Sequence, residues 1–535
     1  MEEQNYWVDI SRRRLSRRQV LKGAARVGLG VVGISILGCA VPVTTTTGGT
    51  LRMAQKSMTG QDPPNPMSGY DKYQTINMYQ GLLSQDAKGN LVPALALSYE
   101  VPEPTVVVWK LRKGVKFHDG TDFNAQAVKV NADRLLNPES KMRRRSRLTT
   151  SAKSADVIDD YTVKYNLVPP GAASIFSLAS VVDLGMVSPT AMKENKNDFR
   201  QRGVGTGPFE FHEWVLDNRV AIKKFVNYWD KGRPYLDQVI SRVVPDQTVA
   251  NTMLKAGELD LLPELEPKDV AVLKTDPNLE VQLAVATSRM ELMLDHREGP
   301  FKNKALRQAL AYAIDKESIA KGVFMGQNPV AQGFFAPSLW VHNPNIRGYP
   351  YDLAKAKEKL KEGGAPDGFS FTVILGTERA TDMMMAEAMK EMLAKAGIKL
   401  ELMVVEQAQV SSFWSTKGKV PPHARISESG SGTIDPHQIM ESNMHPAWGS
   451  QPQARIAEAS DKALEAMLVK ANATYDREER KKLYWEIEKK VVEDVYSALE
   501  IVFSVGRVAY RKKLKGFVPS FDVDVTYFGD AWLQK

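Results

Sequence analysis

Cysteine is almost absent from this sequence, which has one, Cys39, in 535 residues. A single thiol cannot form a disulfide within the chain, and no thiol follows residue 39 to act as a nucleophile. No apolar run of about 18 residues follows Cys39 either, so that part of the chain has no candidate transmembrane helix. The H-E-x-x-H and G-x-S-x-G catalytic patterns are missing as well. These absences predict a fold held by burial without cross-links and favour a protein that is not an enzyme.

Excess positive charge is also small once the first 38 residues are set apart. The formal net charge of the whole chain is +8, but residues 1–38 hold seven Arg or Lys and three acids, which leaves the rest near +4. Binding of nucleic acid requires clustered basic residues on one face. The one basic cluster, residues 141–147, follows an Asn-Pro step and is typical of a solvated loop. We therefore expect no nucleic-acid partner.

The first 38 residues have the pattern of a removable export signal. Arg17 and Arg18 lie in a segment, SRRQVLK, that resembles the twin-arginine signal, although Val20 stands where phenylalanine is usual. The apolar run 27–38 is far shorter than the roughly 20 residues of a membrane-spanning helix and suits the core of a signal peptide. We interpret residues 1–38 as a signal peptide of the twin-arginine type.

Cys39 ends the sequence Ile-Leu-Gly-Cys, which resembles a bacterial lipobox. In a lipobox the cysteine is diacylated and cleavage leaves it as the mature N-terminus; Leu37 is bulkier than usual at its position. Two or three acyl chains, at about 0.8 kcal/mol per buried methylene, make a stable anchor. We expect an extracytoplasmic protein, anchored to the outer face of the cell membrane or periplasmic, with residues 39–49 as a flexible tether. The alternative is a buried N-terminal hairpin in which Cys39 is inert.

The first half of the remaining chain predicts mixed α and β structure. Residues 104–111 and 161–168 have the composition of strands. Between them, Asn124 is placed to cap a helix whose apolar residues repeat at helical spacing. A turn at Asp217 and Asn218 predicts a further pair of antiparallel strands.

The second half predicts a β-α-β unit. Residues 369–375 and 398–405 are strand-like, and residues 382–396 between them form an amphipathic helix pattern that ends at Gly397. Parallel strands joined by a crossover helix form a two-sided sheet, whose edge is the usual place for a ligand. With 535 residues in the chain, two or three domains are expected.

Five groups of residues, in chain order, carry a resemblance that periodicity alone does not supply. They are GLLSQDAKGNLVPALALSYEV, LRKGVKFHDGTDFNAQAV, GTGPFEFHEW, NYWDKGRPYLDQV with LKAGELDLLP, and FKNKALRQALAYAIDKESI. They are similar to segments of the family 5 extracellular solute-binding proteins, the peptide/nickel-type receptors of ABC importers. The similarity runs from near Gly49 to the C-terminus.

The resemblance implies an α/β, two-lobed periplasmic-binding-protein-like fold of the large peptide-binding type, with mixed sheets. Lobe I would comprise residues 50–295 and 500–535, with an extra subdomain at 76–204, and lobe II residues 296–499. The resemblance further implies a monomer without a cofactor that captures a small solute, an oligopeptide or dipeptide, between closing lobes. The solute would be delivered to permease subunits driven by an ATPase. A chemoreceptor partner and a secreted enzyme are the alternatives.

Three other patterns have structural interpretations. The glycine-rich residues 203–208 lack the Lys-Ser/Thr pair of a phosphate loop and predict a tight turn. His118 and Asp119 are neighbours on a turn, which does not give the geometry of a catalytic group and its base. Glu258 and Asp260 belong to the family pattern, and we expect both on a solvated surface.

The ligand is less clear, because a segment that holds peptides in the family is altered here. Peptide-binding members resemble G-W-x-x-D-x-x-[DE]-P, in which the first aspartate pairs with the α-ammonium of the peptide. This chain has ESGSGTIDP, with Ser429 in the place of the tryptophan and Gly432 in the place of the aspartate. A buried ammonium without a carboxylate is strongly unfavourable. A peptide ligand therefore requires Glu428 or Asp435 as a substitute.

The same segment offers a different ligand class. Asp435, His437, Glu441 and His445 bring carboxylate and imidazole groups together within eleven positions, and such groups suit nickel, zinc or iron. Their spacing is not a recognised metal pattern, so we assign no metal ligand. A nickel or other metal chelate, or an opine-like molecule held by hydrogen bonds, is the alternative to a peptide.

Aromatic side chains complete the predicted site. Tyr70 in the first half and Trp340, Trp414 and Trp448 in the second half lie in loop-like segments where they could stack on a ligand. Each could equally pack at a hinge or surface. Whatever the ligand, it can close the lobes only through its differential affinity for the closed state.

Overall fold

The structure, a computed structural model, describes most of the chain. The described residues are 47–58, 60–63, 69–86, 89–140, 142, 145–180, 184–194, 202–296, 299–377, 379–406, 409–410, 413, 423–430, 434–444, 462–495, 498–519 and 527–535. The predicted signal, Cys39 and almost all of the predicted tether lie outside them. None of the helices in these ranges combines the length and the apolar character that crossing a membrane requires.

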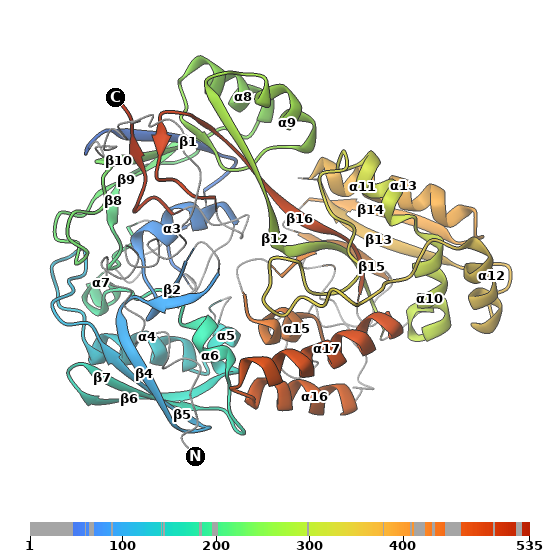
Figure 1. The fold of residues 1–535 in the computed structure, drawn as a ribbon, viewed down its shortest axis with the longest axis horizontal. Coiled ribbons are helices and arrows are strands. Elements are labelled where there is room, and N and C mark those ends of the chain that lie inside the picture. The colour runs from blue at the N-terminus through green and yellow to red at the C-terminus, as the bar shows by residue number, and fades with distance from the viewer. Residues whose placement is uncertain are drawn as a thin grey trace, which may run out of the picture.

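A sheet that has ten strands in the described residues connects both halves of the molecule, in the order β14-β13-β15-β12-β16-β11-β1-β10-β9-β8 (Figure 1). Its strands are β1 (Thr50–Gln55), β8 (Phe209–Val215), β9 (Arg219–Lys224), β10 (Gln238–Val243), β11 (Leu261–Leu262), β12 (Leu279–Leu294), β13 (Ser370–Gly376), β14 (Lys399–Val405), β15 (Ala424–Ser429) and β16 (Ala498–Arg511). We call the half with β1 and β8 to β11 lobe I, and the half with β13 to β15 lobe II. The long strands β12 and β16 pass from one lobe to the other.

Lobe I carries a second, four-stranded antiparallel sheet in the order β4-β5-β7-β6. The other elements of lobe I are β2 (Leu83–Gln85), β3 (Leu91–Pro93), β4 (Ala96–Glu103), β5 (Val106–Leu111), β6 (Ala152–Asp159), β7 (Thr162–Leu167), β17 (Leu514–Lys515), β18 (Trp532–Leu533), η1 (Gly69–Asp71), α3 (Lys72–Met78), α4 (Ala125–Leu136), α5 (Arg145–Thr149), α6 (Ser174–Leu178), α7 (Pro189–Glu194), α8 (Gln247–Ala256) and α9 (Pro267–Lys274). Asn124 caps α4, as predicted, because its side chain accepts a hydrogen bond from the Ala127 amide at 3.0 Å. The core of this sheet centres on Trp109, which packs edge to face on Phe176 with ring centroids 5.9 Å apart.

The glycine-rich segment and the His118 turn are structural, as the sequence indicates. The Gly205 amide donates to Nδ1 of His118, and Nε2 of the same ring lies 3.1 Å from the Gly207 carbonyl. A Cβ at Gly205 would lie 2.1 Å from the Met78 carbonyl oxygen, so only glycine fits this approach. Burial lowers the pKa of His118 to about 4, which keeps the ring neutral.

The expectation that Asp260 lies on a solvated surface is wrong. Its side chain is fully buried and accepts hydrogen bonds from Arg52 Nε at 3.0 Å and Lys513 Nζ at 2.8 Å. Glu258 is exposed, as expected. The two cations come from β1 and from the turn after β16, so no local pattern in the sequence could indicate them.

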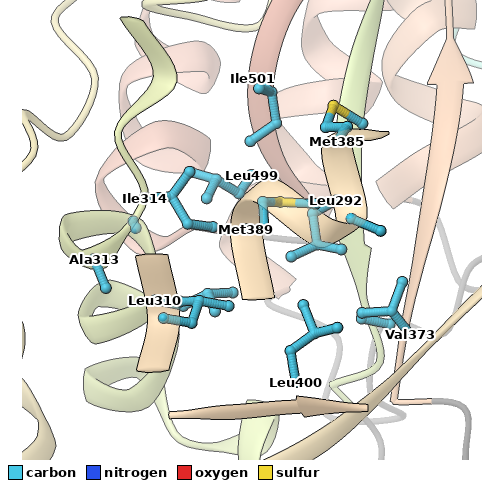
Figure 2. Packing of buried hydrophobic residues seen from close by; sticks show 14 of the residues in the cluster. Leu292, Leu310, Ala313, Ile314, Val373, Met385, Met389, Leu400, Leu499 and Ile501 are labelled. Carbon is cyan, nitrogen blue, oxygen red and sulfur yellow. The ribbon is translucent and has the colours of Figure 1, made fainter. Parts of the chain in front are cut away.

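Lobe II contains the predicted β-α-β unit, with β13 and β14 parallel and joined by α13. The helices of this lobe are η3 (Pro300–Lys302), α10 (Lys304–Ala313), α11 (Lys316–Gly322), α12 (Leu353–Glu362), α13 (Ala380–Ala394), α15 (Pro436–Met444), α16 (Lys462–Ala473) and α17 (Arg477–Asp494). Figure 2 shows the core between sheet and helices, where Leu310 and Met389 face Leu292, Val373 and Leu499. Burying such side chains contributes roughly 1.5–3 kcal/mol each.

The pairing of β12 with β16 is interrupted where the strands pass between the lobes. Val285 pairs with Val505 and Arg289 with Phe503, so three residues of β12, 286–288, face one residue of β16. Such a bulge bends a strand and increases its local twist. Residues 286–288 therefore mark the point at which the connection between the lobes bends.

Candidate functional site

Two parallel strands of lobe II, β13 and β15, end at one edge of the central sheet. Arg379 follows β13, and Glu428 lies near the end of β15. Ser288, in the bulge of β12, lies beside them. Ligands of open α/β sheets bind outside the carboxyl ends of parallel strands. We call Ser288, Arg379 and Glu428 the strand-end site.

Glu428 lies between two donors at the strand-end site. Its Oε1 accepts from Ser288 Oγ at 2.8 Å, and its Oε2 accepts from Arg379 Nη1 at 2.8 Å. The side chain of Glu428 is 15% exposed and that of Arg379 is 48% exposed. The carboxylate raises the pKa of the Arg379 guanidinium, so this cation stays charged at any physiological pH.

Further charges surround the pair. Asp382, in the first turn of α13, is buried, and burial raises its pKa to about 6, with Arg379 opposing the shift and Glu428 adding to it. Arg425 lies close enough to Asp382 to lower this pKa as well. The charge of Glu264, in lobe I, also raises the pKa of Arg379. A ligand at the strand-end site would meet fixed charges of both signs.

Asp435, seven positions after Glu428, is used differently. Its two carboxylate oxygens accept from Nη1 and Nη2 of Arg480 at 2.8 and 2.9 Å, and the side chains are 5% and 7% exposed. Arg480 also donates from Nε to the Ala471 carbonyl at 3.1 Å. This bidentate geometry offsets the cost of burying both charges. Asp435 neutralises a buried arginine.

A cavity of about 50 Å³ lies between the lobes. Leu91 and Phe176 line it from lobe I. Trp340, Ile434 and Tyr475 line it from lobe II, together with the Asp435–Arg480 pair. The space corresponds to about four water molecules, at roughly 12 Å³ each.

Hydrogen bonds join the lobes beside this cavity. The amides of Ala173 and Ser174 donate to the carbonyl and side-chain oxygens of Asn472 at 2.8 and 3.1 Å. The Tyr475 hydroxyl donates to the Pro104 carbonyl at 2.7 Å. In Figure 1 the start of α17 accordingly lies against β5 and α6. The structure thus has the lobes in contact around the cavity.

The structure separates the predicted ligand-binding residues into groups. Glu428 and Ser429 lie at the end of β15, and Glu428 belongs to the strand-end site. Trp340 and Asp435 line the cavity between the lobes. The Trp340 indole donates to the Ile434 carbonyl at 3.1 Å, which fixes the ring as a wall.

The other predicted residues are outside these two places or outside the described residues. His437 is buried in α15, and Tyr70 lies in lobe I against Tyr73, with ring centroids 6.0 Å apart. Three more positions lie outside the described residues: Trp414, Gly432 and Trp448. The binding roles given to all these residues stay predictions.

The metal alternative finds no assembled site in the described part of the chain, where no group of three or more His, Cys, Asp or Glu is suited to hold a metal ion. Asp435 pairs with Arg480, as described above. The side chain of Glu441 and all of His445 lie outside the described residues. Coordination by this set stays an untested alternative.

Sequence reasoning missed Arg379, Arg480 and Tyr475. A signal existed for Arg379, because it lies between the first strand and the helix of the predicted β-α-β unit, where ligands bind. No such signal in the sequence exists for Arg480 or Tyr475. Their importance depends on contacts with Asp435 and Pro104, which are distant in the sequence.

Comparison with known proteins agrees with this architecture. Glutathione-binding protein GsiB of Salmonella choleraesuis (strain SC-B67) is 32% identical over 460 residues, covering 84% of this chain and 88% of that protein. The structure of DppA from Helicobacter pylori in complex with peptide STSA has a TM-score of 0.81 at 26% identity, covering 92% of this chain and 99% of that chain. AgaA from A. tumefaciens R10, in complex with agropinic acid, shares the fold with a TM-score of 0.80 at 24% identity, covering 91% of this chain and 99% of that chain.

The family described as bacterial extracellular solute-binding proteins, family 5 middle, matches residues 90–451. With this match and its two-lobed α/β fold, the chain belongs to the family 5 bacterial extracellular solute-binding proteins.

Proposed function

We propose that this protein, an extracytoplasmic substrate-binding component of an ABC importer, captures a short peptide between its lobes and delivers it to a permease. The observation that carries the proposal is the Arg379–Glu428 pair at the strand-end site. A guanidinium and a carboxylate side by side match the two charged ends of a zwitterion. Neither charge of such a ligand would then be buried without a partner.

The pair has bonding capacity left for a charged group of either sign. Within the described residues, Glu428 takes one of the five N–H donors of Arg379. The others suit a ligand carboxylate, which arginine binds in a bidentate manner. Each oxygen of Glu428 accepts one bond from the chain and retains a lone pair for an ammonium. Glu428 is therefore our candidate for the ammonium anchor, while the pairing of Asp435 with Arg480 argues against Asp435.

The relatives support a peptide. GsiB is named for binding glutathione, and the DppA structure contains the peptide STSA. The second candidate is an organic anion without an ammonium group, such as a metal chelate or an opine-like molecule. It is favoured by the donors that remain on Arg379, which could hold an anion without a contact to Glu428.

We also propose the cellular context that the N-terminal sequence indicates. Residues 1–38 would be a twin-arginine signal peptide, and Cys39 a lipid anchor followed by a tether to residue 49. The mature protein would be a monomer on the outer face of the cell membrane. Lobe I would comprise residues 50–295 and 500–535, and lobe II residues 296–499.

The first experiment identifies the ligand directly. The mature body with Cys39→Ser is purified without an affinity tag and denatured, and released molecules are analysed by mass spectrometry and elemental analysis. Short peptides are the expected result. A single non-peptide molecule or a stoichiometric metal would replace the proposal with the second candidate.

A variant then tests the site. Arg379→Met should weaken peptide binding by about tenfold to a hundredfold, the effect of losing a charge-assisted hydrogen bond. Arg219→Met is the matched control, because Arg219 forms an exposed pair with Glu213 at 2.7 Å at the edge of lobe I. Equal affinities of both variants in calorimetry would remove the strand-end site from the proposal.

A further inference from the structure

The pairing of β12 with β15 brings Ser288 to Glu428. Met290 of β12 pairs with Glu428 of β15, and Ser288 lies two positions before Met290. Side chains two positions apart on a strand point to one face of a sheet, and diagonal neighbours across two strands are within reach of long side chains. The Ser288 hydroxyl accordingly lies 2.8 Å from Oε1 of Glu428, to which it donates a hydrogen bond.

Ser288 and Glu428 differ in their contact with solvent. Ser288 is fully buried, whereas the side chain of Glu428 is partly exposed. A ligand in the space between the lobes could therefore contact the carboxylate of Glu428 but not the hydroxyl of Ser288. The hydroxyl is also shielded from water, so no solvent molecule competes for its bond to the carboxylate.

The other partner of Glu428 is less constant. Arg379 donates from Nη1 to Oε2 at 2.8 Å, but its side chain is half exposed, and a ligand carboxylate would compete for its donors. When Arg379 turns to the ligand, Ser288 still holds the carboxylate of Glu428. Fixing a glutamate side chain costs conformational entropy. A carboxylate that is already fixed by Ser288 therefore binds an ammonium group more tightly than a free one.

We propose that Ser288 is a positioning residue that holds the Glu428 carboxylate in the orientation in which it accepts a ligand ammonium. This inference rests on the peptide function proposed above and adds to it a residue that determines specificity without contacting the ligand. Because Ser288 acts through Glu428, it favours ligands with a free amino group and has little effect on ligands in which that group is blocked.

Two variants in the bulge of β12 provide the test. Ser288→Ala removes the hydrogen bond to Glu428. Thr287→Val is the matched control, because Thr287 is the neighbouring buried residue and its Oγ1 donates to the Gly430 carbonyl at 3.2 Å. The probes are tetra-alanine and N-acetyl-tetra-alanine, which differ only at the amino end, with affinities measured by calorimetry.

We expect the unmodified protein to bind tetra-alanine at least about tenfold more tightly than N-acetyl-tetra-alanine, since acetylation removes the charged partner of Glu428. Ser288→Ala should weaken the binding of tetra-alanine by about threefold to tenfold, the effect of one hydrogen bond. It should change the affinity for N-acetyl-tetra-alanine by less than about twofold. Thr287→Val should leave the ratio of the two affinities unchanged.

A double variant separates an action through Glu428 from any other role of Ser288. Ser288→Ala combined with Glu428→Gln should bind tetra-alanine as Glu428→Gln alone does, because the hydroxyl has no carboxylate left to position. Ser288→Cys has a side chain of similar shape and only a weak donor. It replaces Ser288→Ala in the test if thermal unfolding shows that variant to be unfolded.

An equal loss for both peptides in Ser288→Ala, or an unchanged affinity for tetra-alanine, would overturn the positioning role and leave the peptide function intact. A further loss in the double variant would also overturn it. Equal binding of the two peptides by the unmodified protein would remove Glu428 as the ammonium anchor, and Ser288 with it. If the unmodified protein binds neither peptide, the proposed function fails and the positioning role fails with it.

Discussion

Glu428 and Asp435 are the same kind of group in one short segment, and the fold gives them opposite environments. Glu428 lies at the open end of a strand, with a half-exposed arginine and a serine as partners. Asp435 is enclosed and bound at both oxygens by an arginine that is itself buried. Six residues lie between Glu428, whose carboxylate a ligand could reach, and Asp435, whose carboxylate is bound by Arg480.

The difference shows that an ion pair is defined by its surroundings as much as by its distance. Both pairs have oxygen–nitrogen separations of 2.8 Å. A pair in contact with water contributes little to stability and can exchange partners. A buried pair cannot lose one member without leaving an uncompensated charge. Binding and stability should therefore respond separately to substitutions at the two places.

The largest expected effect is on stability. Asp435→Ala leaves Arg480 buried without a counter-ion and should lower the free energy of unfolding by about 3–5 kcal/mol. Urea denaturation measures this change. The double variant Asp435→Leu, Arg480→Met should recover much of the loss, because it removes both charges together. A loss below about 1 kcal/mol for the single variant would contradict the assignment of Asp435 to the fold.

The next effect is on binding. Glu428→Gln should weaken the affinity for a peptide by about tenfold or more, since a neutral amide cannot replace a carboxylate partner of an ammonium. Its stability should change by about 1 kcal/mol or less, as expected for an accessible pair. Calorimetry and urea denaturation on the same sample give both values. Unchanged affinity for peptides would rule out Glu428 as the anchor.

A smaller effect concerns pH. Burial raises the pKa of Asp382 from 3.8 to about 6, so the folded protein holds this proton more tightly than the unfolded chain. The stabilising contribution is greatest at the lowest pH, decreases as the pH rises from about 4 to about 6, and is constant above that. Asp382→Asn should remove this slope in urea denaturation measured from pH 4 to 7.5. A variant with the same pH dependence as the parent would contradict the assignment of the raised pKa to the burial of Asp382.

The smallest expected effect comes from a variant that weakens the contact between the lobes and leaves the residues proposed to contact the ligand unchanged. Tyr475→Phe keeps the ring at the cavity and removes the hydrogen bond to the Pro104 carbonyl. It should weaken the closed state by about 0.5–1.5 kcal/mol, the usual net contribution of one such bond. Small-angle scattering should show a larger mean radius of gyration without ligand, while each lobe keeps its stability. A uniform loss of affinity across peptides is expected, because the bond to Pro104 is made between the lobes and not to the ligand.

Local patterns were sufficient to predict several elements of the fold. The cap at Asn124 and the β-α-β unit of β13, α13 and β14 depend on neighbouring residues, and the structure contains both. The two-lobed arrangement came from the family resemblance, which the family match supports.

The site was harder to predict, because burial depends on distant parts of the chain. Nothing near Asp435 indicates Arg480, and nothing near Asp260 indicates Lys513. From the sequence alone, Glu428 and Asp435 were equal candidates for the carboxylate that pairs with a peptide ammonium. Only their partners in the fold distinguish them. The cavity could not be predicted at all, because its walls meet only when the two lobes are folded and in contact.

The bulge at residues 286–288 has a mechanical consequence. β12 and β16 form two joined connections between the lobes, and their mutual hydrogen bonds resist sliding and stretching. Bending at the bulge is the relative motion that these bonds resist least, so we expect the lobes to move as rigid arms about the bulge. In such a lever a small rotation at the pivot produces a displacement that grows with distance from it. Figure 1 shows α17 and β5, the elements that follow Tyr475 and Pro104 in the chain, away from the middle of β12, so a small angular change at the bulge would make or break the Tyr475–Pro104 contact.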